Sequence, residues 1–94
     1  MDIHNKLNSI IGNQIRKERK LQKLTIEDLA ELAGVHHTHM GDIERGNVNT
    51  TIVTLFNVTA ALNLNDPSDL LTKATKDLYP QFQEEVTKRT SKKR

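Results

Sequence analysis

The residue pair Gly34–Val35 restricts the fold of this chain more than any other feature of the sequence. The segment before the pair opens on Thr25, whose hydroxyl can accept a hydrogen bond from a helix amide, and it contains Ala30, which is small enough to let another helix cross closely. The segment after the pair places Met40 and Ile43 three residues apart, on one face of a helix. A glycine at such a boundary favours the left-handed turn that ends a helix. The sequence therefore predicts two short helices joined by a tight turn, which is the helix-turn-helix arrangement.

Apolar residues at helical spacing extend this pattern to both sides. Isoleucines and a leucine four residues apart predict a first helix over residues 3–22, which we expect to fray before Leu7. A fourth helix is expected to bury Ile52, Leu55, Val58 and Leu62. No segment shows the pattern of a strand, so the chain is predicted to be all-α, with one domain over residues 1–78. The expected helices are residues 3–22, 26–33, 37–45, 52–62 and 67–78, the last opening on a capping aspartate and a proline.

Residues 79–94 form a C-terminal extension for which three arrangements are open. Tyr79, Phe82 and Val86 continue an apolar stripe, which either folds back onto the chain's own core or forms a dimer contact, because exposed aromatic residues are costly in a small protein. The third arrangement is disorder. We expect the terminal stretch KRTSKKR, residues 88–94, to be disordered because it is too polar to pack.

The composition argues against several classes of protein. The chain has no cysteine, which excludes disulfides and thiolate metal sites and favours a reducing, cytoplasmic location. No apolar run approaches the ~20 residues that span a bilayer, and the N-terminus lacks the pattern of a signal peptide, so we expect no membrane partner.

The charge is unevenly distributed along the chain. Residues 1–24 hold six Lys or Arg against two acidic residues, residues 25–72 hold one against seven, and residues 73–94 hold seven against three. Attraction to phosphates grows with the number of Lys and Arg that reach them. If the partner is a polyanion, the two basic ends must therefore do much of the neutralising.

Four stretches together resemble the Cro/repressor (XRE) type of helix-turn-helix domain over residues 10–71. They are Ile15, Arg16 and Arg19 in the first helix, LAELAGV at residues 29–35, DIERG at residues 42–46 and TLxxVxxALxL at residues 54–64. The resemblance implies a five-helix, lambda-repressor-like bundle whose third helix enters the major groove of double-stranded DNA, usually as a homodimer on a two-fold operator. In its small size the chain is also similar to the controller proteins of restriction–modification systems and to small phage or plasmid regulators. The resemblance implies a transcription regulator that needs no cofactor and has RNA polymerase as a further partner.

The same resemblance implies which residues meet DNA. His37, Thr38 and Asp42 take the positions that reach base edges. Arg19 and Glu44 match a pair that bridges the first helix to the end of the third. The residues implied to contact the DNA backbone are Arg19, Lys23, Thr25, His36, His39, Arg45, Asn47 and Asn49.

Three residues depart from the family pattern. Ile26 stands where a glutamine commonly contacts a phosphate, and His36 replaces the usual serine or threonine cap. Asp42 places a negative charge at the reading edge, where it can accept from cytosine N4 but is repelled by nearby phosphates. We expect the basic residues within 16–23, or the basic tail, to compensate.

Other functions fit these residues less well. His36 and His39 are three residues apart and could face one metal ion, but no further ligand at the right spacing completes a site. No glycine-rich phosphate loop or supported nucleophile–base pair indicates an enzyme. The main alternative is the same fold used to bind another protein, as an antirepressor or antitoxin-like module would, and it accounts better for the acidic middle of the chain.

Overall fold

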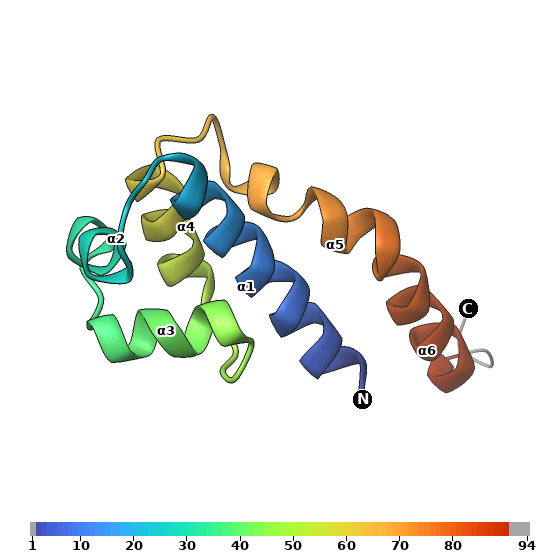
Figure 1. Ribbon diagram of the computed structural model, residues 1–94. Coiled ribbons are helices and arrows are strands. Elements are labelled where there is room, and N and C mark those ends of the chain that lie inside the picture. The colour runs from blue at the N-terminus through green and yellow to red at the C-terminus, as the bar shows by residue number, and fades with distance from the viewer. Residues whose placement is uncertain (1, 91–94) are drawn as a thin grey trace.

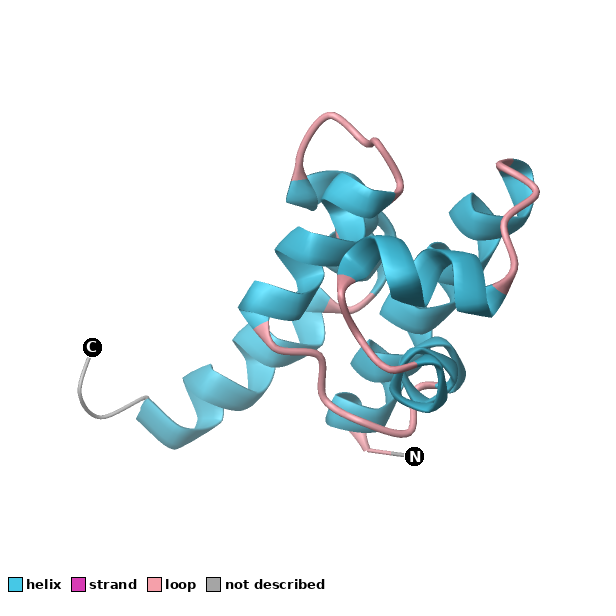
Figure 2. Cartoon of the chain, turned by 90° about the vertical axis from the view of Figure 1, so that its left-hand side faces the viewer, coloured by secondary structure: helices cyan, strands magenta, loops and turns pink. Residues whose placement is uncertain are grey.

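The computed structural model describes residues 2–90, and every regular element in that range is a helix (Figure 1). The all-α fold predicted from the sequence is confirmed, and loops join the helices around the bundle (Figure 2). Element η1 is a short 3-10 helix, and the others are α-helices. In chain order the elements are α1 (Ile3–Leu21), α2 (Ile26–Ala33), α3 (His37–Arg45), α4 (Ile52–Ala61), η1 (Pro67–Leu70), α5 (Thr72–Asp77) and α6 (Tyr79–Thr90).

The helices on either side of the tight turn begin and end where the sequence supplies caps. Thr25 and Asp28 form a reciprocal capping box at the start of α2, in which each side chain accepts from the other residue's amide, at 3.0 and 2.9 Å. Gly34 ends α2 with a φ of 71°, and Gly46 ends α3 with a φ of 75°. Glycine adopts this left-handed conformation without strain, so both helices stop where expected.

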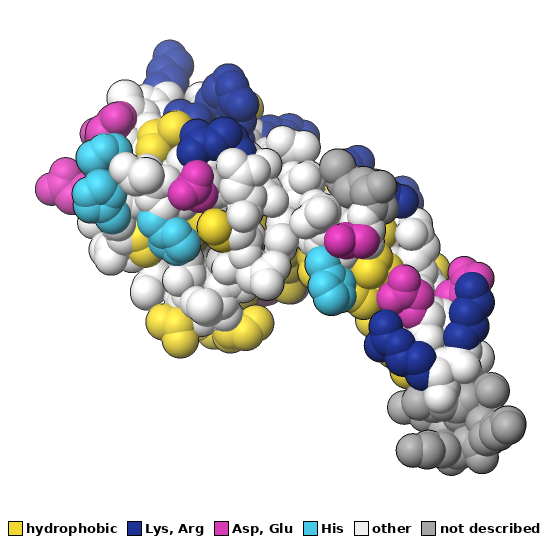
Figure 3. Space-filling view, turned by 90° about the horizontal axis from the view of Figure 1, so that it is seen from below, with side chains coloured by type: hydrophobic (Ala, Val, Ile, Leu, Met, Phe, Trp, Pro, Cys, Tyr) yellow, Lys and Arg dark blue, Asp and Glu magenta, His cyan; other side chains and the backbone are white. Residues whose placement is uncertain are grey.

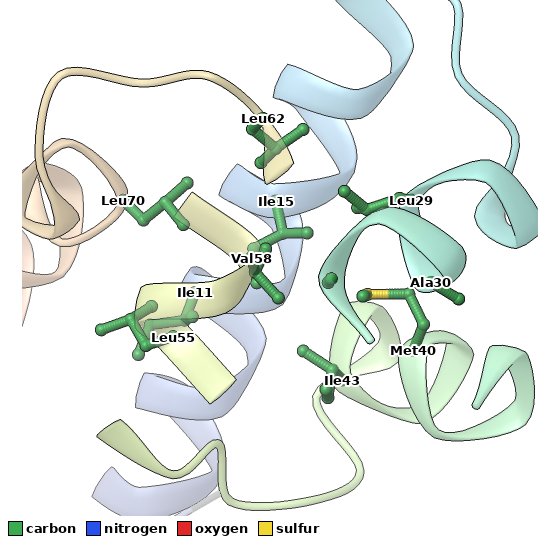
Figure 4. Close-up of a cluster of buried hydrophobic side chains, with 11 residues drawn as sticks. Ile11, Ile15, Leu29, Ala30, Met40, Ile43, Leu55, Val58, Leu62 and Leu70 are labelled. Carbon is green, nitrogen blue, oxygen red and sulfur yellow. The ribbon is translucent and has the colours of Figure 1, made fainter. Parts of the chain in front are cut away.

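Aliphatic side chains from α1, α2, α3, α4 and η1 form the core (Figure 4). Burying a large aliphatic side chain contributes about 1.5–3 kcal/mol to folding. These contacts hold α2 and α3 against α1 and α4 and leave the outer side of α3 at the surface. The fully buried members are Ile15, Leu29, Met40, Ile43, Val58, Leu62 and Leu70.

Helix α1 crosses the C-terminal end of α3 at close range because residue 12 is a glycine. A Cβ atom at Gly12 would overlap the backbone carbonyl oxygens of Ile43 and Glu44. A glycine inside a helix costs about 1 kcal/mol relative to alanine, but here it permits the contact that fixes α3 relative to α1.

The expected burial of Ile52 is wrong. Its side chain is 68 % exposed, whereas Leu55 and Val58 of the same helix and Leu62 at its C-cap are buried. Ile52 is the first residue of α4 and lies beyond the edge of the core that those three side chains reach. Its exposure puts an apolar residue at the surface beside the loop that follows α3.

Two helix boundaries also differ from expectation. The first helix does not fray before its second turn, because the Asp2 carboxylate caps it by accepting from the Asn5 amide at 2.8 Å. Residues 67–78 do not form one helix, since η1 is separated from α5 at Leu71. Asp66 takes the cap position as expected, but its carboxylate accepts from the Ser68 amide at 2.7 Å and so favours a tight 3-10 turn.

The C-terminal extension contains a helix, α6, that continues from α5 and leaves the bundle (Figure 1). Tyr79 is 54 % exposed, while Phe82 and Val86 are half-buried, so the extension folds back onto the chain only in part. The Phe82 ring stacks on that of His4 with 6.2 Å between ring centroids. An open groove of about 460 Å³ separates α6 from α1, and its lining is Leu7, Leu71, Ala74, Thr75, Tyr79, Phe82 and Val86.

The expectation that residues 88–94 are disordered is wrong for residues 88–90, which belong to α6. Ion pairs one helical turn apart, Glu84–Lys88 and Glu85–Arg89, each at 3.5 Å, support the helix at this end. Residues 91–94 lie outside the described part of the chain. Within residues 2–90, no helix is long and apolar enough to cross a membrane.

Candidate nucleic-acid interface

Helix α3 has one buried side and one exposed side. Met40 and Ile43 are buried in the core, as the sequence predicts. His37, Thr38 and His39, in the first turn of the helix, are exposed. Figure 3 shows the histidines of α3 gathered at one end of the face that this helix presents. The structure therefore places two of the three residues assigned to base reading on one accessible edge.

The start of α3 is capped by an imidazole. The Nδ1 atom of His36 accepts a hydrogen bond from the Thr38 amide at 3.2 Å. Its ring stacks on that of His37 with 4.4 Å between centroids, which orients both side chains. Because Nδ1 accepts, the proton of the neutral His36 ring sits on Nε2, which can donate to a phosphate oxygen. The histidine thus takes the place of the usual hydroxyl cap, and the cap leaves its Nε2 atom unused.

Asp42 is paired with Arg45, which the sequence analysis did not predict. An Arg45 Nη2 nitrogen donates to the Asp42 carboxylate at 2.8 Å, and both side chains stay partly exposed. The guanidinium lies over Gly41, where an added Cβ atom would stand 3.0 Å from it. The ion pair neutralises the negative charge of Asp42, which the sequence analysis expects phosphates to repel. The i,i+3 spacing was the signal that could have revealed it.

Arg19 and Glu44 form the ion pair that the family resemblance implies. Arg19 Nε donates to Glu44 Oε2 at 2.7 Å, and Nη2 donates to Oε1 at 3.0 Å. Arg19 Nη1 donates to the carbonyl oxygen of Leu24 at 2.9 Å. The two side chains are only 10 % and 4 % exposed. The hydrogen bond to Glu44 raises the pKa of the guanidinium, outweighing the opposite effect of burial.

This geometry corrects one expectation about Arg19. Because its guanidinium is buried against Glu44 and Leu24, it cannot also contact a phosphate. Arg19 instead fixes α1 to the C-terminal end of α3. We therefore remove it from the residues expected to contact the DNA backbone.

A basic strip runs along the C-terminal half of α1 and the turn after it. Its members are all exposed, and Figure 3 shows Lys and Arg side chains along one edge of the face that carries the α3 histidines. Exposed Lys and Arg side chains are the groups that attract the phosphates of a nucleic acid. Of this strip, only Lys23 was among the expected backbone contacts. We define the basic strip as Arg16, Lys17, Lys20 and Lys23.

The remaining expected backbone contacts occupy the start of α2 and the loop after α3. The Thr25 amide donates to Asp28 and its hydroxyl accepts from the Asp28 amide, so the other amides of this first turn are the groups most open to a phosphate. The pKa of the Asp28 carboxyl is lowered by two hydrogen bonds with Thr25. The bond from the Thr25 amide has the larger effect on this pKa, and the side-chain bond adds to it. Asn47 and Asn49 are exposed in the loop, and the Asn49 side chain accepts from Asn8 at 2.8 Å. That bond ties the loop to α1.

The cap residue His36 and the two histidines of α3, His37 and His39, do not gather into a metal site in this geometry. The Nδ1 atom of His36 is occupied by the cap, and its ring faces that of His37. Across residues 2–90, no group of three or more potential His, Asp or Glu ligands lies close enough to hold an ion.

The family of the chain follows from its matches to known proteins. The family model described as Helix-turn-helix matches residues 15–70. A curated relative, the control protein C.SmaI of Serratia marcescens, is 37 % identical over 67 residues, which are 71 % of this chain and 79 % of the relative.

Solved structures give the same result. The restriction-modification controller protein C.AhdI of Aeromonas hydrophila superposes with a TM-score of 0.65 at 30 % identity, covering 67 % of this chain and 94 % of that one. The clp gene regulator ClgR of Corynebacterium glutamicum superposes with a TM-score of 0.70 at 26 % identity, covering 88 % and 87 %. The matched proteins are regulators rather than enzymes. The chain belongs to the helix-turn-helix family and is a DNA-binding transcription regulator of the controller type.

Proposed function

We propose that this regulator recognises a specific sequence in double-stranded DNA by placing α3 in the major groove. The observation that carries the proposal is the exposed edge of α3, which is held from behind by Met40 and Ile43 and flanked by the basic strip. A major groove admits an α-helix, and each base pair presents a distinct set of donors and acceptors there. The strip supplies the phosphate attraction that the edge itself lacks.

His37, Thr38 and Asp42 are the proposed base readers. A neutral imidazole and a hydroxyl each offer a donor and an acceptor, so they fit several base edges. Asp42 acts together with Arg45, because the ion pair presents a carboxylate acceptor beside guanidinium donors. Arg45 therefore joins the reading edge as well as the backbone contacts. The other proposed backbone contacts are Arg16, Lys17, Lys20, Lys23, Thr25, His36, His39, Asn47 and Asn49.

The proposed active species is a homodimer on a two-fold operator. Two copies of α3 would then enter successive major grooves about 34 Å apart. Tyr79, Phe82 and Val86 are candidates for the contact between copies, since they line an open apolar groove. Occupancy of the operator, in the cytoplasm, would block or recruit RNA polymerase.

Selection from a random pool of duplexes tests this proposal. The native chain should enrich a two-fold site, and His37→Ala should relax the preference at one base pair of each half-site. Gln81→Ala, an exposed position on α6, is the matched control and should select the native site. An unchanged site for His37→Ala would remove this residue from the reading edge.

A protein-binding use of the fold is the second candidate, because residues 25–72 are acidic. Two of those acidic residues are neutralised in the structure, Glu44 by Arg19 and Asp42 by Arg45. That pairing weakens the case for a positively charged protein partner. If selection enriches no duplex and the native chain binds none at low salt, the protein-binding function would replace the proposed one.

A further inference from the structure

One stripe of residues on α3 lies on the side of the helix that faces away from the core. Its members are spaced by three or four residues, which aligns them along one helix face. They are Thr38, Gly41, Asp42 and Arg45. Met40 and Ile43, which are buried in the core, lie on the opposite side of the helix from this stripe. The side chains of Asp42 and Arg45 are 35 % and 55 % exposed, so a partner can reach them.

Gly41 belongs to this accessible stripe and is nevertheless buried. The three atoms nearest to a Cβ atom placed on Gly41 all belong to the guanidinium of Arg45, with Nη1 at 3.0 Å, Nη2 at 3.3 Å and Cζ at 3.5 Å. The guanidinium therefore lies over residue 41, in the space that a larger side chain would fill. Long side chains on a helix normally point toward its N-terminus in this way. Because residue 41 has no side chain, the donors of Arg45 reach the middle of α3.

Asp42 fixes the direction of this guanidinium. Arg45 Nη2 donates to Asp42 Oδ1 at 2.8 Å. The bond uses one N–H donor of a group that has several, and one oxygen of a carboxylate that has two. An exposed ion pair contributes little to folding, so stability alone does not account for this arrangement. The pair presents guanidinium donors beside a carboxylate acceptor, in a fixed order on the accessible side of α3.

We propose that Gly41, Asp42 and Arg45 together make this regulator specific for a G·C base pair at one position of each half-site. In the major groove, guanine presents two acceptors, N7 and O6, and its cytosine presents the N4 donor. The guanidinium can donate to both guanine atoms while the carboxylate accepts from cytosine N4, so the order of groups on the pair matches the order on the bases. An A·T pair presents the N6 donor between two acceptors and does not match. The inference rests on the proposed function, since it names the base pair that one part of α3 reads.

The rival role for Arg45 is the contact with the DNA backbone that the family resemblance implies. The Asp42 carboxylate beside the guanidinium would repel a phosphate, whereas at a G·C pair it has a donor to meet. The two roles also differ in what the loss of Arg45 does. Loss of a phosphate contact weakens binding to all duplexes alike and lowers the salt slope by about 1, whereas loss of a base contact removes the preference at one position.

The first test selects duplexes from a random pool with the native chain and three variants. Gly41→Leu keeps both charges but fills the space of the guanidinium, and leucine favours a helix, so the fold should be kept, which circular dichroism checks. The native chain should select a guanine at one position of the half-site. Gly41→Leu and Arg45→Ala should each reduce that preference by about tenfold or more and leave the other positions as they are. Arg16→Ala, which removes an exposed arginine of the basic strip, is the matched control and should keep the guanine.

The second test changes the base instead of the protein, so the folding of a variant does not enter. Replacing the selected guanine by 7-deazaguanine removes the N7 acceptor and should weaken binding by the native chain about tenfold. Replacing it by hypoxanthine removes only the amino group in the minor groove and should leave the affinity nearly unchanged. The Arg45→Ala variant should bind the 7-deazaguanine duplex as tightly as the unmodified one, because the group that would contact N7 is gone.

The outcomes separate this inference from the proposed function. If the native chain selects a site but neither Gly41→Leu nor Arg45→Ala relaxes a guanine in it, the inference is overturned and the proposed function stands. The same holds if Arg45→Ala weakens binding to every duplex alike and lowers the salt slope by about 1, since that result identifies a phosphate contact. If the native chain selects no duplex, the proposed function fails and the inference fails with it.

Discussion

The ion pair between Arg19 and Glu44 gives the sharpest prediction for stability. Replacing Glu44 by alanine removes the acceptor of two charge-assisted hydrogen bonds, at 2.7 and 3.0 Å, and leaves the guanidinium buried. A hydrogen bond to a charged group contributes about 1.5–3 kcal/mol, and breaking a buried pair from one side costs about 3–5 kcal/mol. We therefore expect Glu44→Ala to lower the free energy of unfolding by about 3–5 kcal/mol.

Urea denaturation measures this change. The dependence of the unfolding free energy on urea concentration should equal that of the native chain, which shows that the variant unfolds from the same folded state. The double variant Arg19→Met/Glu44→Leu removes both charges together and should be within about 1–2 kcal/mol of the native chain. Glu84→Ala is the control, because it breaks the exposed pair with Lys88 and should change stability by less than about 0.5 kcal/mol.

The pH dependence of this effect can be worked out in sign. Glu44 raises the pKa of Arg19, so the stabilisation of the charged guanidinium is fully present below the ordinary arginine pKa and is lost only as pH rises past the raised value. The cost of Glu44→Ala should therefore be the same at about pH 6 and about pH 9. If that cost is below about 1 kcal/mol, as for a solvated pair, the account of a buried pair that fixes α1 to α3 is refuted.

Three further predictions follow from single contacts. Gly12→Ala should lower stability by about 1–3 kcal/mol in urea denaturation, because the added Cβ atom would overlap two carbonyl oxygens of α3. This loss is expected although alanine has the higher helix propensity, and an equal or higher stability would show that α1 and α3 can separate freely. Lys20→Ala should reduce the slope of log affinity against log salt by about 1, and an unchanged slope would remove this residue from the phosphate contacts. Because Thr25 lowers the pKa of Asp28, that capping box stabilises the fold above the ordinary aspartate pKa and loses this effect as pH falls through the lowered value. Asp28→Asn should therefore make stability less dependent on pH below about 4 in acid titrations, and an identical acid profile would contradict the assignment.

Much of the helical framework could be predicted because the signals are local. Thr25 and Gly34 mark the start and end of α2 through hydrogen bonds and a backbone angle that depend on neighbouring residues alone. The burial of Met40 and Ile43 follows from their spacing once the turn is known. Such features do not depend on which distant part of the chain packs against them.

The errors concern features that only the packed molecule determines. Helical spacing shows that Ile52 and Leu55 share a helix, but it does not show where the core ends, and Ile52 lies beyond that edge. A family pattern places Arg19 near DNA and near Glu44, whereas burial permits only the second contact. The family pattern directs Arg45 to the phosphates and leaves Asp42 as an isolated negative charge, whereas in the structure the two side chains form an ion pair.

The affinity of the native chain for a selected duplex, titrated with salt, tests sequence-specific DNA binding most directly. If α3 reads bases while the basic strip and the loop after α3 neutralise phosphates, affinity should fall by orders of magnitude between about 50 and about 200 mM salt. At every salt concentration the selected duplex should also bind more tightly than an unrelated one, with the difference carried by His37, Thr38 and the Asp42–Arg45 pair. Equal affinity for both duplexes, or binding that does not respond to salt, would contradict the account.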